Sequence, residues 1–285
     1  MKIRTIGIVG AGQMGCGIAH VAVLAGFDVV LTDIDAEILD QGMESVAANL
    51  DRQIRRGTVE RSERDQILGR IRTSTHLKDH AKSELVVESA VERLEIKAEI
   101  FRQLDDICPN PTILASNTSS ISITKLGTVT RRPDRVAGMH FMNPVPMMRL
   151  VEVIRGLDTS PDTIELVNDV ARTMDKSPVE CADLPGFVSN RLLMPMINEA
   201  IVAVAENVAT PQAIDEIMTL GMNHPMGPLA LADLIGLDSC LSVMRTLHLE
   251  LGDSKYRPSP LLIRMVDAGR LGRKSGRGFY TYPEA

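Results

Sequence analysis

The sequence contains few aromatic residues, and this scarcity excludes one class of function. Phe, Trp and Tyr make up only 3% of the 285 residues, Trp is absent, and the formal net charge is −6. Proteins that bind nucleic acids need a basic surface, and those that bind single strands also use stacked aromatic rings. A chain with neither feature overall is not expected to bind nucleic acid.

Cysteine is also scarce, and the four cysteines lie far apart in the sequence, at Cys16, Cys108, Cys181 and Cys240. They form no CxxC pair and no Cys–His pair with the spacing of a zinc site, so no metal is expected. Thiols that stay reduced are typical of a cytoplasmic protein. No apolar run approaches the roughly 18 residues of a membrane-spanning helix, which predicts no membrane association.

The residues that are present are ordinary for a globular protein, with 44% hydrophobic and 24% charged side chains. At roughly 150 residues per domain, the length favours about two domains. In the first part, apolar strand patterns alternate with helical patterns, which is typical of a doubly wound α/β fold. The strand patterns cover residues 3–9, 28–32, 85–91, 112–116, 135–141, 149–154 and 177–181.

The pattern changes near residues 183–186, after which the sequence predicts helices and no strand. The helical patterns cover residues 187–207, 211–219, 228–251 and 259–269, separated by Gly and Pro. We therefore predict an α/β domain over residues 1–183, followed by an all-helical C-terminal domain over residues 184–285.

A glycine-rich turn, Gly10-Ala11-Gly12-Gln13-Met14-Gly15, connects the first predicted strand to the first predicted helix. Its first glycine allows a tight turn, the second lets the backbone approach a pyrophosphate, and the third lets the helix pack on the strand. Asp33 ends the next strand, where a carboxylate accepts hydrogen bonds from the ribose of NAD and repels the 2′-phosphate of NADP. The sequence therefore predicts a Rossmann-type NAD-binding domain, with FAD as an alternative from the turn alone.

Two polar residues on predicted strands indicate acid–base chemistry. His140 lies near the end of one strand, and Glu152 lies within the next. Strand alternation places Glu152 on the same face as Leu150 and Ile154, where an unpaired acid is costly. An imidazole that becomes charged during turnover would satisfy the carboxylate. The pattern therefore favours a general base formed by His140 and Glu152.

Two further polar residues have two interpretations each. Ser119 follows the strand at 112–116, and loops after the strands of a doubly wound sheet line the ligand crevice. It could also cap a helix that begins near Ile121. Asn190 opens the first predicted helix of the second domain, where it could be an ordinary first-turn polar residue. The local sequence leaves these alternatives open.

Together these motifs resemble the NAD-dependent (S)-3-hydroxyacyl-CoA dehydrogenase family, and most closely its short bacterial members that act on 3-hydroxybutyryl-CoA. The resemblance covers essentially the whole chain, and the string around His140 is more specific than the glycine turn. The motifs occur in family order: GAGQMG, Asp33, SNTSS (116–120), HFMNPVP (140–146), LVEVI (150–154), DLPGFVSNR (183–191), PMGPL (225–229) and GRLGRKSGRGFY (269–280).

The resemblance implies a role for each matching residue. His140 is implied as the catalytic base with Glu152 as its partner, and Ser119 and Asn190 are implied to position the reacting oxygens of the substrate. Without the resemblance, charges such as Glu92 and Lys97 would be interpreted as solvated helix residues. Cofactor contacts are implied at the glycine turn and at Asp33, Glu92, Lys97, Asn117, Ser119 and Asn143. A homodimer formed through the helical domain is also implied.

The acyl-CoA substrate needs local positive charge despite the acidic chain. Residues 51–72 contain seven arginines and four acidic residues, and Arg52 and Arg56 lie one helical turn apart. They could bind the 3′-phosphate of coenzyme A, or they could belong to a solvated helix face. Two other functions remain open: an NAD-dependent dehydrogenase of a free hydroxy acid, such as a sugar acid, and a non-catalytic NAD-binding protein. The basic segment argues against the first, and the presence of His140 and Glu152 argues against the second.

Overall fold

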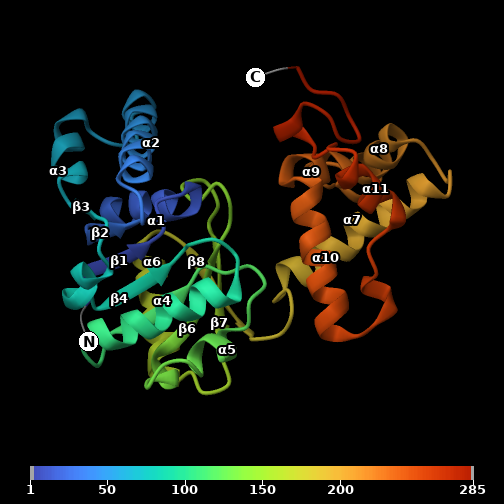
Figure 1. Cartoon of the computed structure of the whole chain (residues 1–285). Helices are drawn as coiled ribbons and strands as arrows, with labels where there is room; N and C mark the ends of the chain where they lie inside the picture. Colours follow the sequence, from blue (N-terminus) through green and yellow to red (C-terminus); the bar gives the residue numbers. More distant parts are fainter. Residues whose placement is uncertain (1–2, 284–285) are drawn as a thin grey trace. The chain divides into compact units, whose positions relative to one another are not determined.

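An eight-stranded sheet forms the centre of the first of two units, Met1–Leu184 and Pro185–Ala285, into which the chain divides (Figure 1). The computed structural model describes residues 3–283. The strands are β1 (Thr5–Val9), β2 (Asp28–Thr32), β3 (Ile71–Ser74), β4 (Leu85–Glu88), β5 (Ile113–Ser116), β6 (Val136–Phe141), β7 (Leu150–Arg155) and β8 (Ser177–Ala182). Their order is β3-β2-β1-β4-β5-β6-β7-β8, and every pair of neighbours is parallel except β6 and β7.

Helices connect these strands, as the crossovers between parallel strands require. They are α1 (Gln13–Leu24), α2 (Ala36–Arg55), α3 (Arg64–Leu68), α4 (Leu94–Ile107), α5 (Ile123–Gly127) and α6 (Pro161–Thr173), with 3-10 turns η1 (Arg61–Glu63), η2 (Leu77–Lys82) and η3 (Pro133–Arg135). The predicted doubly wound α/β fold is confirmed. The sequence prediction missed β3, an edge strand of only four residues with no buried side chain.

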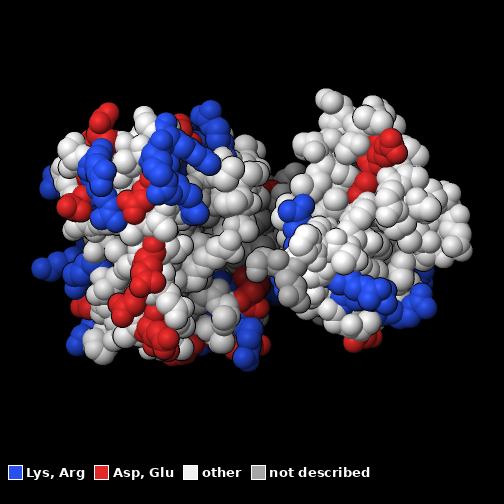
Figure 2. All heavy atoms as spheres, turned by 90° about the horizontal axis from the view of Figure 1, so that it is seen from above, with Lys and Arg blue, Asp and Glu red and all other residues white. Residues whose placement is uncertain are grey.

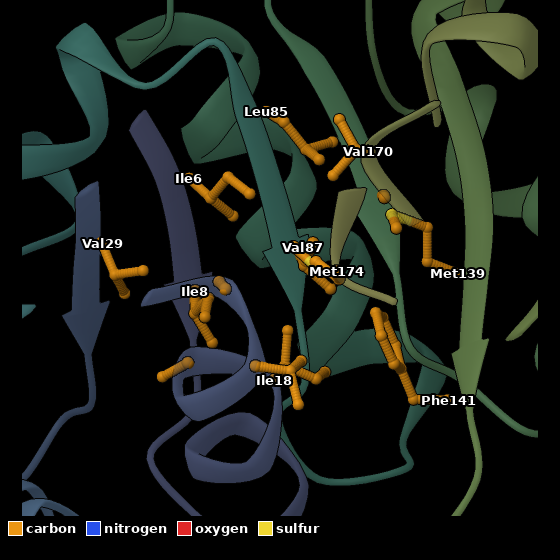
Figure 3. Packing of buried hydrophobic residues seen from close by; sticks show 14 of the residues in the cluster. Ile6, Ile8, Ile18, Val29, Leu85, Val87, Met139, Phe141, Val170 and Met174 are labelled. Carbon is orange, nitrogen blue, oxygen red and sulfur yellow. The ribbon is translucent and has the colours of Figure 1, made fainter. Parts of the chain in front are cut away.

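The central strands are apolar because they are buried on both faces, whereas the edge strands β3 and β8 are largely exposed. Alternate residues of the central strands, such as Ile8, Val87 and Met139, share one hydrophobic core with Ile18 of α1 and Val170 of α6 (Figure 3). The residues between them therefore point to the opposite face. His140 and Glu152 belong to that opposite face, because each lies between two residues of this core. Alternation thus places both polar side chains on the same side of the sheet.

The second unit is helical and has its own core. Its helices are α7 (Ser189–Ala205), α8 (Pro211–Met222), α9 (Pro228–Ile235), α10 (Leu237–Leu251) and α11 (Pro260–Asp267), with 3-10 turns η4 (Ser254–Tyr256) and η5 (Arg273–Ser275). The predicted helical C-terminal region is confirmed, but the prediction of one helix over residues 228–251 is wrong. Gly236, with φ near +103°, ends α9 before α10 begins, because helical backbone requires negative φ.

Candidate active site

Close packing requires glycine at two positions of the turn between β1 and α1. The Gly10 amide donates to the Thr32 carbonyl at 2.7 Å, and its φ is near +103°. A Cβ at Gly10 would lie 2.5 Å from the Ser89 carbonyl oxygen, and one at Gly15 would lie 1.8 Å from the Gly10 carbonyl oxygen. A side chain at either position would therefore displace the turn or the helix.

The same turn leaves room for a phosphate. Gly12 is the N-cap of α1, no side chain caps this helix, and no acidic residue lies in its first turn. A Cβ at Gly12 would meet no atom within 4 Å. Unpaired N–H groups at the start of a helix bind anions, so these features fit the pyrophosphate of a dinucleotide. Gln13 and Met14 form the first residues of this helix.

The Asp33 carboxylate lies beside the glycine turn. One oxygen accepts a hydrogen bond from the Ala11 amide at 2.7 Å, and the other accepts one from the Ile34 amide at 2.8 Å. These bonds fix an acidic group where β2 ends, next to the helix N-terminus. The residues present therefore fit the adenosine ribose of NAD, whose hydroxyls are donors to a carboxylate at this position.

His140 and Glu152 lie directly opposite each other on β6 and β7. The distance from His140 Nδ1 to Glu152 Oε2 is 2.8 Å, and the two side chains are 10% and 4% exposed. A carboxylate can only accept hydrogen bonds, so Nδ1 carries the hydrogen of this bond and Nε2 is the basic nitrogen of the neutral ring. This is the arrangement of a general base whose tautomer is fixed by an acid.

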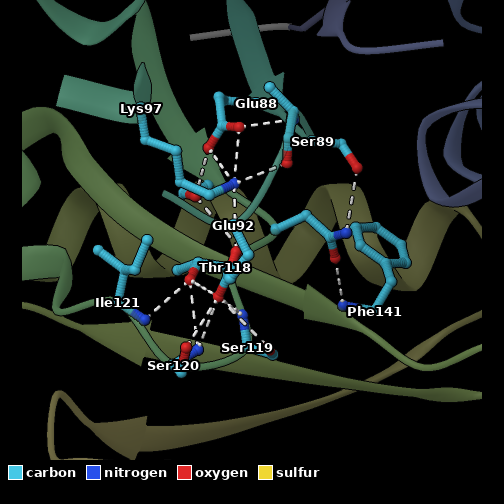
Figure 4. Close-up of polar contacts among 12 residues, drawn as sticks. Glu88, Ser89, Glu92, Lys97, Thr118, Ser119, Ser120, Ile121 and Phe141 are labelled. Atoms are coloured by element: carbon cyan, nitrogen blue, oxygen red, sulfur yellow. Dashed lines mark hydrogen bonds and ion pairs between the residues drawn. The ribbon is translucent and has the colours of Figure 1, made fainter. Parts of the chain in front are cut away.

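The Asn117 side chain links the segment that follows β4 to the last residue of β6. Its Oδ1 accepts from the Phe141 amide at 2.9 Å, and its Nδ2 donates to Ser89 Oγ at 3.2 Å (Figure 4). Phe141 follows His140 directly on β6. Asn117 therefore fixes the backbone beside the imidazole, in addition to any contact it makes with a ligand.

Glu88, Lys97 and Glu92 form a charged cluster after β4. Lys97 Nζ lies 2.7 Å from Glu88 Oε1 and 3.4 Å from Glu92 Oε2, and the Lys97 and Glu88 side chains are essentially unexposed (Figure 4). Ser116 Oγ also donates to Glu88, at 2.6 Å. Burial raises the pKa of Glu92, but the Lys97 charge and hydrogen bonds from Thr118, Ser119 and Ser120 outweigh this and lower it overall.

Sequence reasoning missed two carboxylates that organise this region. One is Glu88, for which the signal was an acid at the end of the apolar run LVVE. The other is Asp183, which accepts from Ser122 Oγ at 2.7 Å and from the Ile123 and Thr124 amides at 2.9 and 2.7 Å. Asp183 thus caps α5 from the end of β8, a contact between residues about sixty positions apart that no local pattern reveals.

The remaining predicted residues lie on other elements of the chain. Asn143 is exposed in the loop after β6, and Asn190 is the second residue of α7 in the second unit. Arg52 and Arg56 are exposed at the end of α2, where Arg52 donates to Asn49. Basic side chains gather on the side of the first unit that carries α2 and α3, with a few acidic residues among them (Figure 2), and the basic residues of the segment 36–72 are all arginines.

Two further observations cover residues 3–283. In that range, no group of three His, Cys, Asp or Glu side chains lies close enough together to hold a metal ion. None of the helices described there is both long enough and apolar enough to cross a lipid bilayer.

Comparison with known proteins gives a consistent result. Residues 5–184 match the family model of the 3-hydroxyacyl-CoA dehydrogenase NAD binding domain, and residues 186–282 match that of the 3-hydroxyacyl-CoA dehydrogenase C-terminal domain. A probable 3-hydroxybutyryl-CoA dehydrogenase of Bacillus subtilis is 56% identical over 100% of this chain and 99% of that protein. A 3-hydroxybutyryl-CoA dehydrogenase of Bradyrhizobium diazoefficiens is 52% identical over 98% and 96% of the two chains.

A solved structure is similar over the same length. The crystal structure of (S)-3-hydroxybutyryl-CoA dehydrogenase from Ralstonia eutropha has a TM-score of 0.97 and 50% identity, over 99% of this chain and 100% of that one. The sheet order, the glycine turn and the imidazole–carboxylate pair define an NAD-dependent dehydrogenase. The chain belongs to the 3-hydroxyacyl-CoA dehydrogenase family.

Proposed function

We propose that the protein interconverts (S)-3-hydroxybutyryl-CoA and acetoacetyl-CoA with NAD as cofactor. The observation that carries the proposal is the buried pair at 2.8 Å between His140 and Glu152, in the same unit as a dinucleotide turn. The relatives named for 3-hydroxybutyryl-CoA, 52% and 56% identical, support this acyl chain over longer ones.

The residues of the chain would supply the proton chemistry. Glu152 accepts the Nδ1 hydrogen of His140, so the opposite nitrogen, Nε2, takes the proton of the substrate's 3-hydroxyl. The carboxylate then stabilises the imidazolium. In the reductive direction the imidazolium returns the proton to the carbonyl oxygen. Ser119 and Asn190 would orient the reacting oxygens, in the role that the family resemblance implies.

Bound NAD would supply the hydride acceptor for C3 of the hydroxyacyl chain and, as NADH, the hydride donor for the reverse reaction. The turn Gly10–Gly15 would hold the pyrophosphate and Asp33 the ribose, for the reasons given by their geometry. Lys97, Asn117 and Asn143 are proposed as further cofactor contacts, because they match family positions. The family resemblance implies a cofactor contact at Glu92 as well.

Steady-state kinetics with acetoacetyl-CoA test this proposal. Because like charges placed together cost several kcal/mol, we expect kcat/KM with NADH to exceed that with NADPH by about 10²-fold. Free acetoacetate, which lacks coenzyme A, should be a poor substrate. Equal rates with free acetoacetate and acetoacetyl-CoA would favour a dehydrogenase of a free acid, and no turnover of either would contradict the proposal.

The basic residues Arg52 and Arg56 are proposed to bind the phosphates of coenzyme A. Replacing both with Glu should raise KM for acetoacetyl-CoA by about tenfold, leave KM for NADH nearly unchanged, and matter less at high salt. The matched control replaces Arg102 and Arg172 with Glu, since both are exposed and each pairs with an acid three positions earlier. An equal rise in KM in the control would contradict a specific role for the α2 pair.

A homodimer formed through the helical unit is also proposed. Three apolar side chains at the end of α8 are largely exposed: Ile217 at 58%, Leu220 at 78% and Met222 at 62%. A group of exposed apolar side chains is more typical of an interface than of a monomer's surface. Replacing Ile217 and Leu220 with Asp should yield monomers in analytical ultracentrifugation, whereas Leu157→Asp, at an exposed leucine of the first unit, should not. A monomeric unmodified protein would contradict the proposal.

The four unpaired thiols support a reducing location, the cytoplasm.

A further inference from the structure

Hydrogen-bond donors of the loop after β5 converge on one oxygen of Glu92 (Figure 4). The acceptor is Oε1, and the donors come from three consecutive residues, two of which contribute both a hydroxyl and an amide. They are Thr118 Oγ1 at 2.5 Å, the Ser119 amide at 3.0 Å, Ser119 Oγ at 3.2 Å, the Ser120 amide at 3.1 Å and Ser120 Oγ at 3.0 Å. Glu92 lies 26 positions before Thr118 in the sequence, so the conformation of this loop depends on a side chain from another segment.

Five donors exceed what one carboxylate oxygen accepts at once, because it has about two lone pairs. The amides of Ser119 and Ser120 are part of the backbone and cannot rotate away, whereas the hydroxyls can. Ser119 Oγ has the longest of the five distances. Its hydroxyl can therefore turn to a ligand while the two amides continue to hold the loop.

A buried cation keeps Glu92 in the form that can hold these amides. Its other oxygen faces Lys97, whose charge is in turn balanced by the buried Glu88. A neutral carboxyl or an amide would present a hydrogen where the carboxylate presents only acceptors. The carbonyl oxygen of either group could still accept from the two amides, but its hydrogens would face the Lys97 ammonium, so the ionised form is the one that both holds the amides and balances the lysine.

We propose that Glu92 is a positioning residue that acts through Ser119: it holds the loop so that the Ser119 hydroxyl meets the reacting oxygen of the substrate. This inference rests on the proposed function, because Ser119 contacts a 3-hydroxyacyl or 3-ketoacyl chain only in that reaction. It differs from the role that the family resemblance implies, in which Glu92 contacts the cofactor. The two roles predict different effects on NADH binding.

The test compares Glu92→Gln with Glu95→Gln, the same change at a carboxylate of α4 that is 78% exposed. Three quantities are measured: kcat with acetoacetyl-CoA and NADH, the Kd of NADH by fluorescence, and amide hydrogen exchange over residues 117–121. We expect Glu92→Gln to lower kcat by about 10- to 100-fold, the worth of a lost charge-assisted hydrogen bond. The Kd of NADH should change less than about twofold, and exchange at the Ser119 and Ser120 amides should accelerate.

Double variants separate positioning from general damage. With Ser119→Ala already present, Glu92→Gln should lower kcat little further, because the contact between the Ser119 hydroxyl and the substrate is already lost. Glu92→Asp keeps the charge but has a shorter side chain, so it should retain part of the activity. If Glu92→Gln does not fold, Glu92→Asp takes its place in these measurements. Independent losses that multiply would overturn the proposal.

Other outcomes have equally definite meanings. A weakened Kd of NADH with unchanged kcat would show a cofactor contact and overturn the positioning role. Unchanged hydrogen exchange over residues 117–121 would also overturn it, because the loop would not depend on Glu92. If the unmodified protein does not turn over acetoacetyl-CoA, the proposed function fails, and the exchange data alone then decide whether Glu92 holds the loop.

Discussion

Both units bury carboxylates that accept from backbone amides, but the first unit also pairs two of its buried carboxylates with a lysine and a histidine. In the first unit, Glu88 faces the ammonium of Lys97 and Glu152 faces the imidazole of His140. In the second unit, Asp233 accepts from the Phe279 and Tyr280 amides and from the Tyr282 hydroxyl, each at 3.0 Å.

The second buried acid of the helical unit follows the same pattern. Asp215 accepts from the Leu229 and Ala230 amides at the start of α9, at 2.8 and 2.9 Å, and from the Tyr280 hydroxyl at 2.7 Å. Burial, together with the hydrogen bond and charge of Asp215, raises the pKa of Tyr280 well above its usual value. Both acids thus accept hydrogen bonds from backbone amides and tyrosine hydroxyls, groups that do not give up their protons, and so they stabilise the local fold.

The difference teaches that burial alone does not mark a catalytic carboxylate. A carboxylate that accepts from backbone amides holds structure, whereas one that faces an imidazole can support proton transfer. On this basis the structure separates Glu152 from Asp215 and Asp233, although all three are nearly unexposed. The predictions below test that separation.

The largest expected effect is on the imidazole of the first unit. His140→Ala should lower kcat by roughly 10²–10⁴, the usual contribution of a positioned acid–base group. The Kd of NADH, measured by fluorescence, should change little, because the glycine turn and Asp33 are untouched. Full activity in His140→Ala would contradict the catalytic role of the pair and leave no functional difference between Glu152 and the buried acids of the helical unit.

A second buried imidazole of the first unit should affect stability instead of catalysis. His80 Nε2 lies 2.9 Å from the Thr32 hydroxyl, and within residues 3–283 it has no carboxylate at hydrogen-bond distance. Burial lowers the pKa of His80 from 6.5 to about 4. The folded state therefore binds fewer protons than the unfolded state between these values, and stability that is complete above pH 6.5 is lost towards pH 4, by about 3 kcal/mol.

Urea unfolding at pH 7 and pH 4.5 measures this effect. His80→Gln should lose less stability over that interval than the unmodified protein, while the exposed His76→Gln should behave like the unmodified protein. The kcat of folded His80→Gln should be close to normal. An unchanged pH dependence in His80→Gln would show that His80 does not control acid sensitivity.

The smallest expected effect concerns the helical unit. Asp233→Asn places an amide where only acceptors fit, and should lower the free energy of unfolding by about 2 kcal/mol. All three tyrosines lie in this unit, at Tyr256, Tyr280 and Tyr282, so tyrosine fluorescence during urea unfolding reports on it alone. The kcat of the folded variant should be retained. A loss of kcat at unchanged stability would place Asp233 among the catalytic acids.

The local sequence was sufficient for much of the fold and for part of the candidate site. The glycine turn is a contiguous signal, Asp33 follows it after one helix and one strand, and the period of two in the strand at 149–154 placed Glu152 on a buried face. Pairing with His140 followed because an isolated acid on an apolar face is costly. Each of these inferences depends on residues within one strand–helix–strand unit or on two strands that follow each other in the sequence.

Other features depend on contacts between distant segments and could not be predicted in this way. Lys97 has the surroundings of a solvated helix residue in the sequence, yet it is 1% exposed because Glu88 of β4 lies beneath it. The five donors around Glu92 come from a loop after another strand. Asp183 likewise contacts α5 from 60 positions later in the sequence.

The most direct test of the central claim is a double-mutant cycle on the pair in the first unit. Glu152→Gln should lower kcat with acetoacetyl-CoA and NADH, because it removes the charge beside the imidazolium while keeping the shape. Combined with His140→Ala, it should add almost no further loss, because the two groups act as one unit. Losses that multiply in the double variant would contradict the account and give Glu152 the same structural role as Asp233.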